Sequence, residues 1–512
     1  MKSALLSGIA LLVVTTASDS YEVGTHDVLS LAAVSRSTLV TTDLLRQSFG
    51  LEGPDTVFPD SLGVPQKVDA LISRGAQLED TLSLLRPLNH FFNPMTGRGL
   101  SYGIFPTQNP SPNWVLEDIT KIQGQQYSYR IGRQYLLNAL TKSAKKERDQ
   151  SFGLMFQTLG HVIHHVQDMA QPQHVRNDVH CDFPPCAFIG AFAPSGYEIH
   201  TDKVSETLRT DPALAGPQYQ LSDTATNNRF LSMFNTPRKF WHTEAPGPNS
   251  PVLGKGIAEF TQRNFVSAGT NFASGSAGFG PNANFPLPVP TSTPSNVEVV
   301  DIASLPGTSG LRGQVWFVKS QVVDNFTGAP PVENPRAATF SIFDNDLQRV
   351  NPGFGRIFSL NSFNYDEAHK FLIPRAVAYS AGLINYFFRG KLDYVDDPQL
   401  PGVNRIRNLS NETMKGTFAF YYDATDGTRS PVPNARWEGI TLPPYNASIT
   451  NPADPAYGFA VAFNPPTDPA PKPRGNTCWS LPAILVRRRP KRRLAVLVRL
   501  PRSGSRVRAG LW

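Results

Sequence analysis

The chain is 512 residues long, and 40% of these residues are hydrophobic and 17% charged. This balance is that of a globular protein and excludes the compositional extremes of disordered and fibrous chains. The length allows two or three domains, and the 45 prolines and 39 glycines predict long irregular connections between their elements.

The net charge of +7 comes from one end of the chain. Twelve of the 48 Lys and Arg lie from Lys472 onward, where there is no Asp or Glu, so the preceding residues carry 36 basic and 41 acidic side chains and a net charge of −5. The part of the chain that carries chemistry is therefore mildly acidic, whereas the basic end can contact anionic surfaces.

Residues 1–20 have the pattern of a signal peptide. Lys2 precedes a short apolar run over residues 4–14, and small residues such as Ala17 and Ser20 follow. The run is shorter than the roughly 20 residues that cross a bilayer. We therefore expect a secreted or periplasmic protein.

Residues 21–280 are predicted mainly as helices. The clearest is the apolar run over residues 152–166, whose spacing is that of a buried helix, and Pro172 is expected to stop it. From about 281 to 360 an irregular insertion mixes strand-like pieces with Pro and Gly. A further helix is predicted over residues 374–388, with its proline in the first turn.

Beyond residue 390 the hydrophobic residues alternate with a period of two, as in strands. Phe418, Phe420 and Tyr422 alternate before a turn-forming Asp-Gly pair. Residues 391–470 are therefore predicted as a small β module, of which a β-sandwich is one form. Residues 471–512 are expected to have little order, and they are either a polycationic tail or the product of a frameshift.

The residues that say most about chemistry lie at the end of the predicted helix over 152–166. His164 and Asp168 are four residues apart, so in a helix they project from one face and can share a metal ion. A proline then breaks the helix and lets His174 fold back toward the same place. Burying imidazoles and a carboxylate among apolar residues costs free energy unless they are paired or bind metal. This segment therefore predicts a metal site.

Four other residues are less informative when taken alone. His161 and His165 are explained more simply as supporting or surface residues. Upstream, Asp80 closes a predicted helical segment and His90 precedes an aromatic turn. Either of these two is by itself more typical of a helix cap or a core residue.

The order of the candidate residues carries more information than any one of them. Along the chain they are His26, Asp80, His90, His164, Asp168, His174 and a Tyr197-Glu198 pair. This order resembles the superfamily of bacterial zinc-dependent phospholipases C and single-strand-specific zinc nucleases. The resemblance covers residues 21–200 and the predicted helix over 374–388, and it implies an all-helical domain that binds up to three zinc ions.

Carried over position by position, the resemblance implies a set of ligands for each zinc ion. The first ion would be held by Asp80, His90, His164 and Asp168. The second would be held by Asp168, which bridges the two ions, with His174 and Glu198. The third would be held by His26 and the mature N-terminus, which is Tyr21 if the signal peptide is cut after Ser20. The resemblance also implies that Asp80 is catalytic, as the acceptor of a proton from the attacking water.

Two positions depart from the family pattern. The family has a histidine four residues before the glutamate, and Pro194 stands there. Either His180 or His200 would have to replace it, and His180 is favoured because it follows His174 closely in the same loop. The mature family chain also begins with Trp, whereas here cleavage after Ser20 would expose Tyr21 and cleavage after Ala17 would expose Ser18.

Together these observations predict a mainly α protein: an all-helical phospholipase C-like catalytic domain over residues 21–390 with an irregular insertion, then the β module and the basic tail. Its expected function is metal-dependent hydrolysis of a phospholipid or another phosphodiester, with zinc as cofactor and no obligate protein partner evident. A single-strand-specific nuclease is the alternative, but the net acidic charge before residue 472 disfavours binding of a polyanion. A zinc-containing binding protein without turnover is the alternative of another class.

Overall fold

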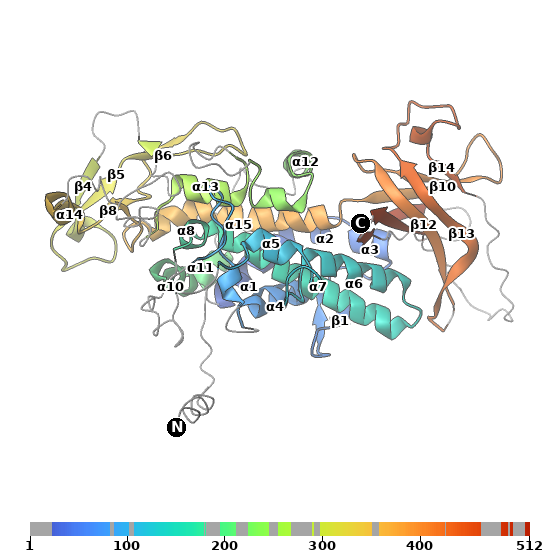
Figure 1. The fold of residues 1–512 in the computed structure, drawn as a ribbon, viewed down its shortest axis with the longest axis horizontal. Helices are drawn as coiled ribbons and strands as arrows, with labels where there is room; N and C mark the ends of the chain where they lie inside the picture. Colours follow the sequence, from blue (N-terminus) through green and yellow to red (C-terminus); the bar gives the residue numbers. More distant parts are fainter. Residues whose placement is uncertain are drawn as a thin grey trace, which may run out of the picture.

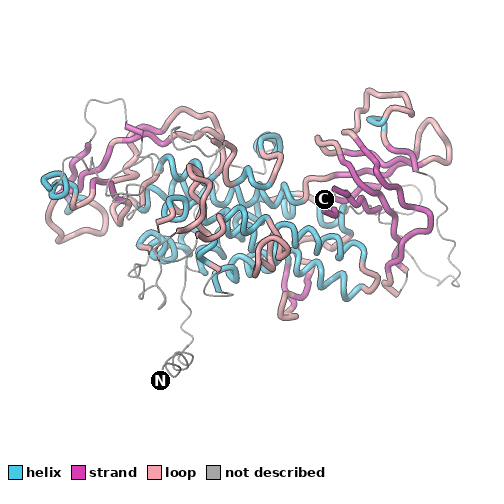
Figure 2. Tube along the Cα trace, in the orientation of Figure 1, coloured by secondary structure: helices cyan, strands magenta, loops and turns pink. Residues whose placement is uncertain are grey.

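The computed structural model describes residues 23–81, 86–101, 107–178, 180, 195–210, 224–244, 254–267, 289–290, 297–350, 358–424, 426–461, 483–489, 492–494 and 507–511. Within these ranges a central bundle of helices is flanked at opposite ends by two regions of strand (Figures 1 and 2). The predicted signal peptide, Tyr21 and Pro194 lie outside the described residues.

Two 23-residue helices, α7 (Lys145–Gln167) and α15 (Tyr365–Phe387), form the centre of the bundle. The helices packed around them are α1 (Val23–Arg36), α2 (Thr38–Thr41), α3 (Leu44–Phe49), α4 (Val68–Thr81), α5 (Ser111–Leu116), α6 (Tyr129–Thr141), α8 (Pro172–Arg176), α10 (Gly196–Lys203), α11 (Ser205–Thr210), α12 (Thr224–Met233) and α13 (Ile257–Asn264). Short 3₁₀ turns are η1 (Pro87–Asn89), η2 (Asp168–Ala170) and η5 (Pro237–Phe240), and a hairpin is formed by β1 (Val57–Pro59) and β2 (Pro65–Lys67).

The predicted helix over 152–166 is confirmed as the second half of α7, where nearly all residues are buried and the apolar ones belong to the main hydrophobic core. The role predicted for Pro172, to stop this helix, is wrong. α7 ends at Gln167, η2 follows, and Pro172 instead begins α8. Proline is well suited to the first position of a helix because the N–H that it lacks would have no intrahelical partner there.

The predicted start of the last helix is also wrong, because α15 begins at Tyr365 and Pro374 lies inside it. A proline inside a helix costs about 3 kcal/mol, since it removes a backbone hydrogen bond and crowds the preceding turn. From Ala368 onward almost every residue of α15 is buried. Burial of so many apolar side chains offsets the cost of one proline.

Two glycines set the distance between α4 and α7. A Cβ atom on Gly75 would lie 1.9 Å from the carbonyl oxygen of Gln157, and one on Gly160 would lie 2.0 Å from that of Ile72. Both distances are far below van der Waals contact, so only glycine permits this approach. The last turns of both helices carry the predicted ligands, so the approach brings those ligands together.

The segment between α13 and α15 forms two small antiparallel sheets, in agreement with the strand-like pieces predicted for the insertion. One has the order β3 (Val289–Pro290), β6 (Ser320–Val322) and β7 (Val332–Glu333). The other has the order β4 (Val297–Asp301), β5 (Gln314–Val318), β8 (Thr339–Phe340) and β9 (Phe358–Ser359), with η6 (Ile302–Ser304) and α14 (Asp344–Val350) in its connections. The expectation of an all-helical domain is therefore too narrow, and the fold is a mixture of helices and strands.

The predicted β module consists of two four-stranded antiparallel sheets. One sheet has the order β14 (Phe459–Val461), β11 (Asn404–Asn408), β10 (Lys391–Asp396) and β17 (Val507–Leu511). The other has the order β13 (Arg429–Leu442), β12 (Met414–Asp423), β15 (Ala483–Arg489) and β16 (Arg492–Leu494), and η8 (Pro455–Tyr457) precedes β14. Three stretches of the basic tail, where we expected little order, are thus strands.

The alternation in β12 has a clear structural role. Phe418 and Phe420 point into a core that the two sheets share, which also contains Leu392 and Ile406. Ala419, on the opposite face of β12, belongs to the core of the helical bundle. The β module therefore packs on the bundle through one face of this strand. Within the described ranges, none of the helices combines the length and hydrophobicity that a bilayer-crossing segment needs.

The contact between α4 and α7 predicts the effect of a single methyl group. Gly160→Ala should lower the free energy of unfolding by about 1–3 kcal/mol, because the helices must separate to admit it. Gly132→Ala in α6 is the matched control, since its Cβ would lie 3.3 Å from a side-chain methyl of Thr158 and no closer to backbone. Urea unfolding of both variants measures the difference, and equal effects would contradict the proposed role of Gly160.

Candidate metal centre

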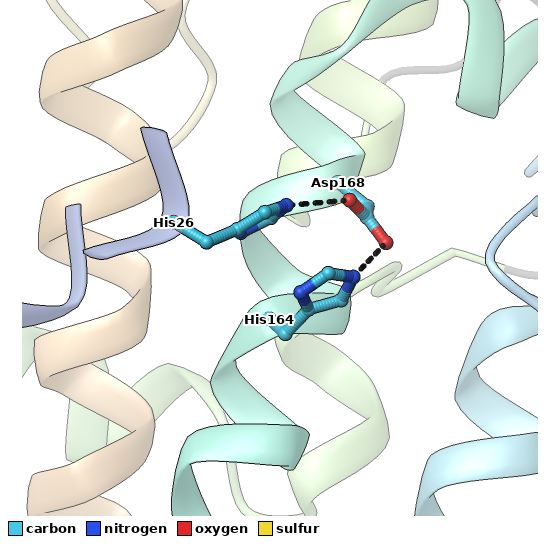
Figure 3. Close-up of side chains that lie close together, drawn as sticks. All are labelled: His26, His164 and Asp168. Carbon is cyan, nitrogen blue, oxygen red and sulfur yellow. Dashed lines mark ion pairs between the residues drawn. The ribbon is translucent and has the colours of Figure 1, made fainter. Parts of the chain in front are cut away.

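Asp168, at the carboxyl end of α7, is the residue around which the candidate site is built. Its Oδ2 lies 3.1 Å from Nδ1 of His90, 3.2 Å from Nε2 of His164 and 3.8 Å from Nδ1 of His174. Its Oδ1 lies 3.5 Å from Nε2 of His26, whose ring stacks on that of His164 with centroids 3.8 Å apart (Figure 3). One buried carboxylate is therefore surrounded by four imidazoles from four separate segments.

Asp80, in the last turn of α4, adds a second carboxylate to the same cluster. Its Oδ1 lies 3.3 Å from Nδ1 of His90 and 3.4 Å from Nε2 of His164, and its Oδ2 lies 4.0 Å from Nε2 of His26. The helical spacing explains the contact between His164 and Asp168, because these residues are one turn apart along the chain at the end of α7. The contacts of Asp80 and His26 depend instead on the packing of α4 and α1 against that turn.

Hydrogen bonds from the other ring nitrogens orient two of these histidines. Nδ1 of His164 donates to the carbonyl oxygen of Ala76 over 2.8 Å, and Nδ1 of His26 donates to Oε1 of Gln167 over 2.6 Å. Both rings therefore present Nε2 to the carboxylates. Such outer contacts fix the orientation of metal-binding histidines in known metal sites.

The electrostatics of this cluster favour positive charge. Burial alone would lower the pKa of His164, but the nearby Asp168 and Asp80 raise that pKa well above its usual value. Burial would likewise raise the pKa of Asp168, but His164, His174 and His90 hold it well below its usual range. A buried pair of carboxylates therefore requires a cation, either a proton on an imidazole or a metal ion between the side chains.

A second group of ligands lies beside the first. Nε2 of His174 and Nε2 of His180 lie 3.2 Å and 3.0 Å from the same Oε1 of Glu198. Ser195 caps α10 and accepts a hydrogen bond from the Glu198 N–H, which places this glutamate in the first turn. The ring of Phe91 stacks on His174 with centroids 4.6 Å apart.

The structure places His180, and not His200, beside Glu198. His200 lies against Asp366 of α15 instead. The Glu198 carboxylate outweighs the effect of burial and raises the pKa of His180 to about 9. In turn, the two imidazoles lower the pKa of Glu198 despite its burial.

Glu79, which was not predicted from the sequence, adjoins Asp80 and organises a second buried network that meets the first at His90, whose Nε2 lies 3.8 Å from Oε1 of Glu79. Its Oε2 lies 2.6 Å from Nη2 of Arg86 and 2.6 Å from Nδ1 of His161, and its Oε1 lies 3.0 Å from Nε2 of His165. Of the two interpretations given to His161 and His165, the surface one is wrong because both side chains are fully buried, whereas their contacts to Glu79 agree with a supporting role. The only signal in the sequence for this network was that His161 and His165 are one helical turn apart, on one face of an otherwise apolar helix.

Both histidines of this network are neutral at ordinary pH. Burial lowers the pKa of His161 to about 4 and that of His165 to about 3, although Glu79 acts in the opposite direction. The pKa of Glu79 lies well below its usual value, because Arg86 and the two histidines outweigh the effect of burial. A charged carboxylate is thus satisfied entirely by protein groups.

The clusters around Asp168 and Glu198 have the donors that a metal ion needs. Three groups bring one nitrogen or oxygen per residue within 4.8 Å of one another: His26 with His164 and Asp168, Asp80 with His90 and His164, and His174 with His180 and Glu198. Among the described residues, both Asp168 oxygens, Oδ2 of Asp80 and Nδ1 of His174 have no hydrogen-bond partner. Such buried atoms are costly unless a ligand satisfies them, and imidazole with carboxylate is a set that suits zinc.

All predicted ligands that the structure describes thus meet in neighbouring clusters. Tyr21 lies outside the described residues, so its role as a ligand stays a prediction. A scan of the chain against models of known protein families and against curated protein sequences gave no match. The resemblance to the zinc phospholipases and nucleases therefore stays a proposal that rests on the site residues.

The Glu79 network predicts a dependence of stability on pH. The pKa values of about 4 for His161 and about 3 for His165 lie below the ordinary 6.5. Between pH 6.5 and 4 the unfolded chain therefore binds protons that the folded chain does not, so the free energy of unfolding falls as the pH is lowered. Each histidine contributes up to about 1.4 kcal/mol per pH unit.

His161→Gln removes one of these two groups. The variant should lose less stability than the wild type between pH 7 and pH 5, because one proton fewer distinguishes its unfolded from its folded state. Urea unfolding at several pH values measures the two slopes. Identical slopes would show that His161 does not titrate in this way.

Proposed function

We propose that this chain is a zinc-dependent phosphoric ester hydrolase of the phospholipase C type. The observation that carries the proposal is the buried Asp168 carboxylate, which lies within 4 Å of four imidazoles and faces a second cluster through His174. One carboxylate that serves two adjacent groups of nitrogen and oxygen donors is suited to bridge two cations. Paired cations are typical of enzymes that displace groups at phosphorus.

The ligands are assigned from the contacts described above. The first zinc would be held by Asp80, His90, His164 and Asp168. The second would be held by Asp168, His174, His180 and Glu198. His180 would replace the histidine that the family has at the position of Pro194. A third would be held by His26 and the mature N-terminus at Tyr21.

Zinc, when bound, lowers the pKa of water toward 7 and neutralises negative charge on phosphoryl and leaving-group oxygens. The protein residues supply position and proton transfer. Asp80 has a buried Oδ2 with no hydrogen-bond partner among the described residues, and we assign to it the role of accepting a proton from the attacking water. His164 and His26 are held in place by Ala76 and Gln167. No covalent intermediate with the protein is required.

The surroundings of the site support a phospholipid or a similar small phosphodiester as substrate. Phe91, Phe92 and Trp114 lie near the site but are buried in the protein. Side chains that stack on nucleic-acid bases must be exposed, so these three are poorly placed for a nuclease. The net charge of −5 before Lys472 also disfavours a nuclease, because it would repel a polyanionic substrate. With a signal peptide, such an enzyme would act outside the cytoplasm.

Asp168→Asn tests the proposal because it keeps the shape of the side chain and removes its charge. The variant should bind fewer zinc ions per chain and lose hydrolysis of phosphatidylcholine by more than about 100-fold, since a shared ligand affects both cations. Asp346→Asn is the matched control, because Asp346 is a surface residue of α14 with a side chain that is 75% exposed. Zinc is counted by mass spectrometry and phosphocholine release is assayed with and without chelator.

Other outcomes of the same measurements identify the alternatives. Cleavage of single-stranded DNA without phosphocholine release would assign the nuclease function instead. Zinc that is bound by the wild type and lost in Asp168→Asn, with neither activity, would indicate a zinc-binding protein without turnover. A wild-type chain that binds no zinc would overturn the proposal.

A further inference from the structure

A separate cluster of imidazole and carboxylate groups lies between α10 and α15. His200 of α10 and both Asp366 and His369 of α15 bring one donor atom each within 4.8 Å of one another. Nε2 of His200 lies 2.6 Å from Oδ1 of Asp366. We propose that these three side chains form a further binding site for one zinc ion or a similar divalent transition metal ion, distinct from the centre around Asp168.

The helical geometry of α10 separates the two sites. His200 follows Glu198 by two residues, which corresponds to a rotation of about 200° around a helix. The two side chains therefore leave α10 in nearly opposite directions, and Glu198 points toward His174 and His180 while His200 points toward α15. A single ion cannot contact both.

The environment of His369 selects the nitrogen that can bind a metal ion. The hydroxyl of Thr201 donates its proton to the carbonyl oxygen of Tyr197 over 2.7 Å. The same hydroxyl oxygen lies 2.8 Å from Nε2 of His369, so it accepts a hydrogen bond from that nitrogen. Nε2 therefore carries the ring proton and Nδ1 carries the lone pair. This pattern, with one ring nitrogen held by a protein group, is the usual one for metal-binding histidines.

The remaining features are those of an open, three-ligand site. Asp366 and His369 are three residues apart and lie on one face of α15. His369 is buried, whereas the side chains of His200 and Asp366 are 27% and 83% exposed. Burial and the neighbouring His200 lower the pKa of His369 to about 4, so this ring is neutral at physiological pH. Water can complete the coordination from the exposed side.

A bound ion would also affect the centre around Asp168, because Glu198, a proposed ligand there, lies on α10. It would join α10, which carries Glu198, to the N-terminal end of α15. Without an ion, the exposed contact between His200 and Asp366 contributes little, because exposed ion pairs stabilise proteins only weakly. The ion would therefore hold α10 in place more strongly than the side chains can alone.

The test uses the full-length chain with its zinc and two variants, His200→Ala and Asp366→Asn, whose altered side chains are partly exposed. The wild type should bind one zinc ion more per chain than either variant, measured by titration calorimetry and by mass spectrometry. Added zinc should also raise the melting temperature of the wild type further than that of the variants, because binding to the folded state stabilises it. Asp346→Asn is the control and should match the wild type in both measurements.

The outcome is independent of the function proposed for the first centre. Asp168→Asn should lose zinc at that centre and keep the ion that depends on His200, so the double variant Asp168→Asn with His200→Ala should bind one ion fewer than Asp168→Asn alone. Equal zinc counts and equal zinc-dependent melting shifts in the wild type, His200→Ala and Asp366→Asn would overturn the inference.

Discussion

The contact between α4 and α7 through Gly75 and Gly160 determines which side chains can meet in the centre of this protein. Any side chain at either position would collide with the backbone of the opposite helix. Because the helices lie so close, the carbonyl oxygen of Ala76 reaches the ring of His164, and both carboxylates at the end of α4 reach histidines of α7. The geometry of the site therefore follows from a packing constraint located one turn away from it.

The two adjacent carboxylates of Glu79 and Asp80 on α4 differ in the groups that balance their negative charge. Glu79 is neutralised by Arg86 and by hydrogen bonds from two imidazoles and Trp114. Among the described residues, the ion-pair partners of Asp80 and Asp168 are all imidazoles. A carboxylate next to a fixed guanidinium needs no further cation, whereas two carboxylates whose partners are all imidazoles need either a proton on an imidazole or a metal ion. This contrast makes the cluster of Asp80 and Asp168 a better candidate for a metal site than the network around Glu79, although both consist of buried acidic and histidine side chains.

The local spacing of residues predicted the parts of the structure that depend on local geometry. The run over 152–166 is a helix and His164 faces Asp168 on it, because both statements depend only on the period of an α-helix. The alternation of Phe418 and Phe420 likewise predicted β12. The order of the candidate ligands was sufficient to name His26, Asp80, His90, His174 and Glu198 together, and the choice of His180 over His200 followed from its place in the loop after His174. In the structure His180 lies beside Glu198.

Only the tertiary structure decided the features that depend on distant segments. Nothing in the local pattern distinguished Glu79 from Asp80, since their different partners come from α7 and from the turn around Arg86. Nor could local pattern place His200 next to His369, which is 169 residues later, or extend α15 through Pro374. By itself the sequence determined the helical and strand periods, because these are properties of neighbouring residues, and the order of its histidines and carboxylates named the side chains that cluster around Asp168 and Glu198. The partner of each side chain was decided by packing, because burial and electrostatic energy depend on which segments meet.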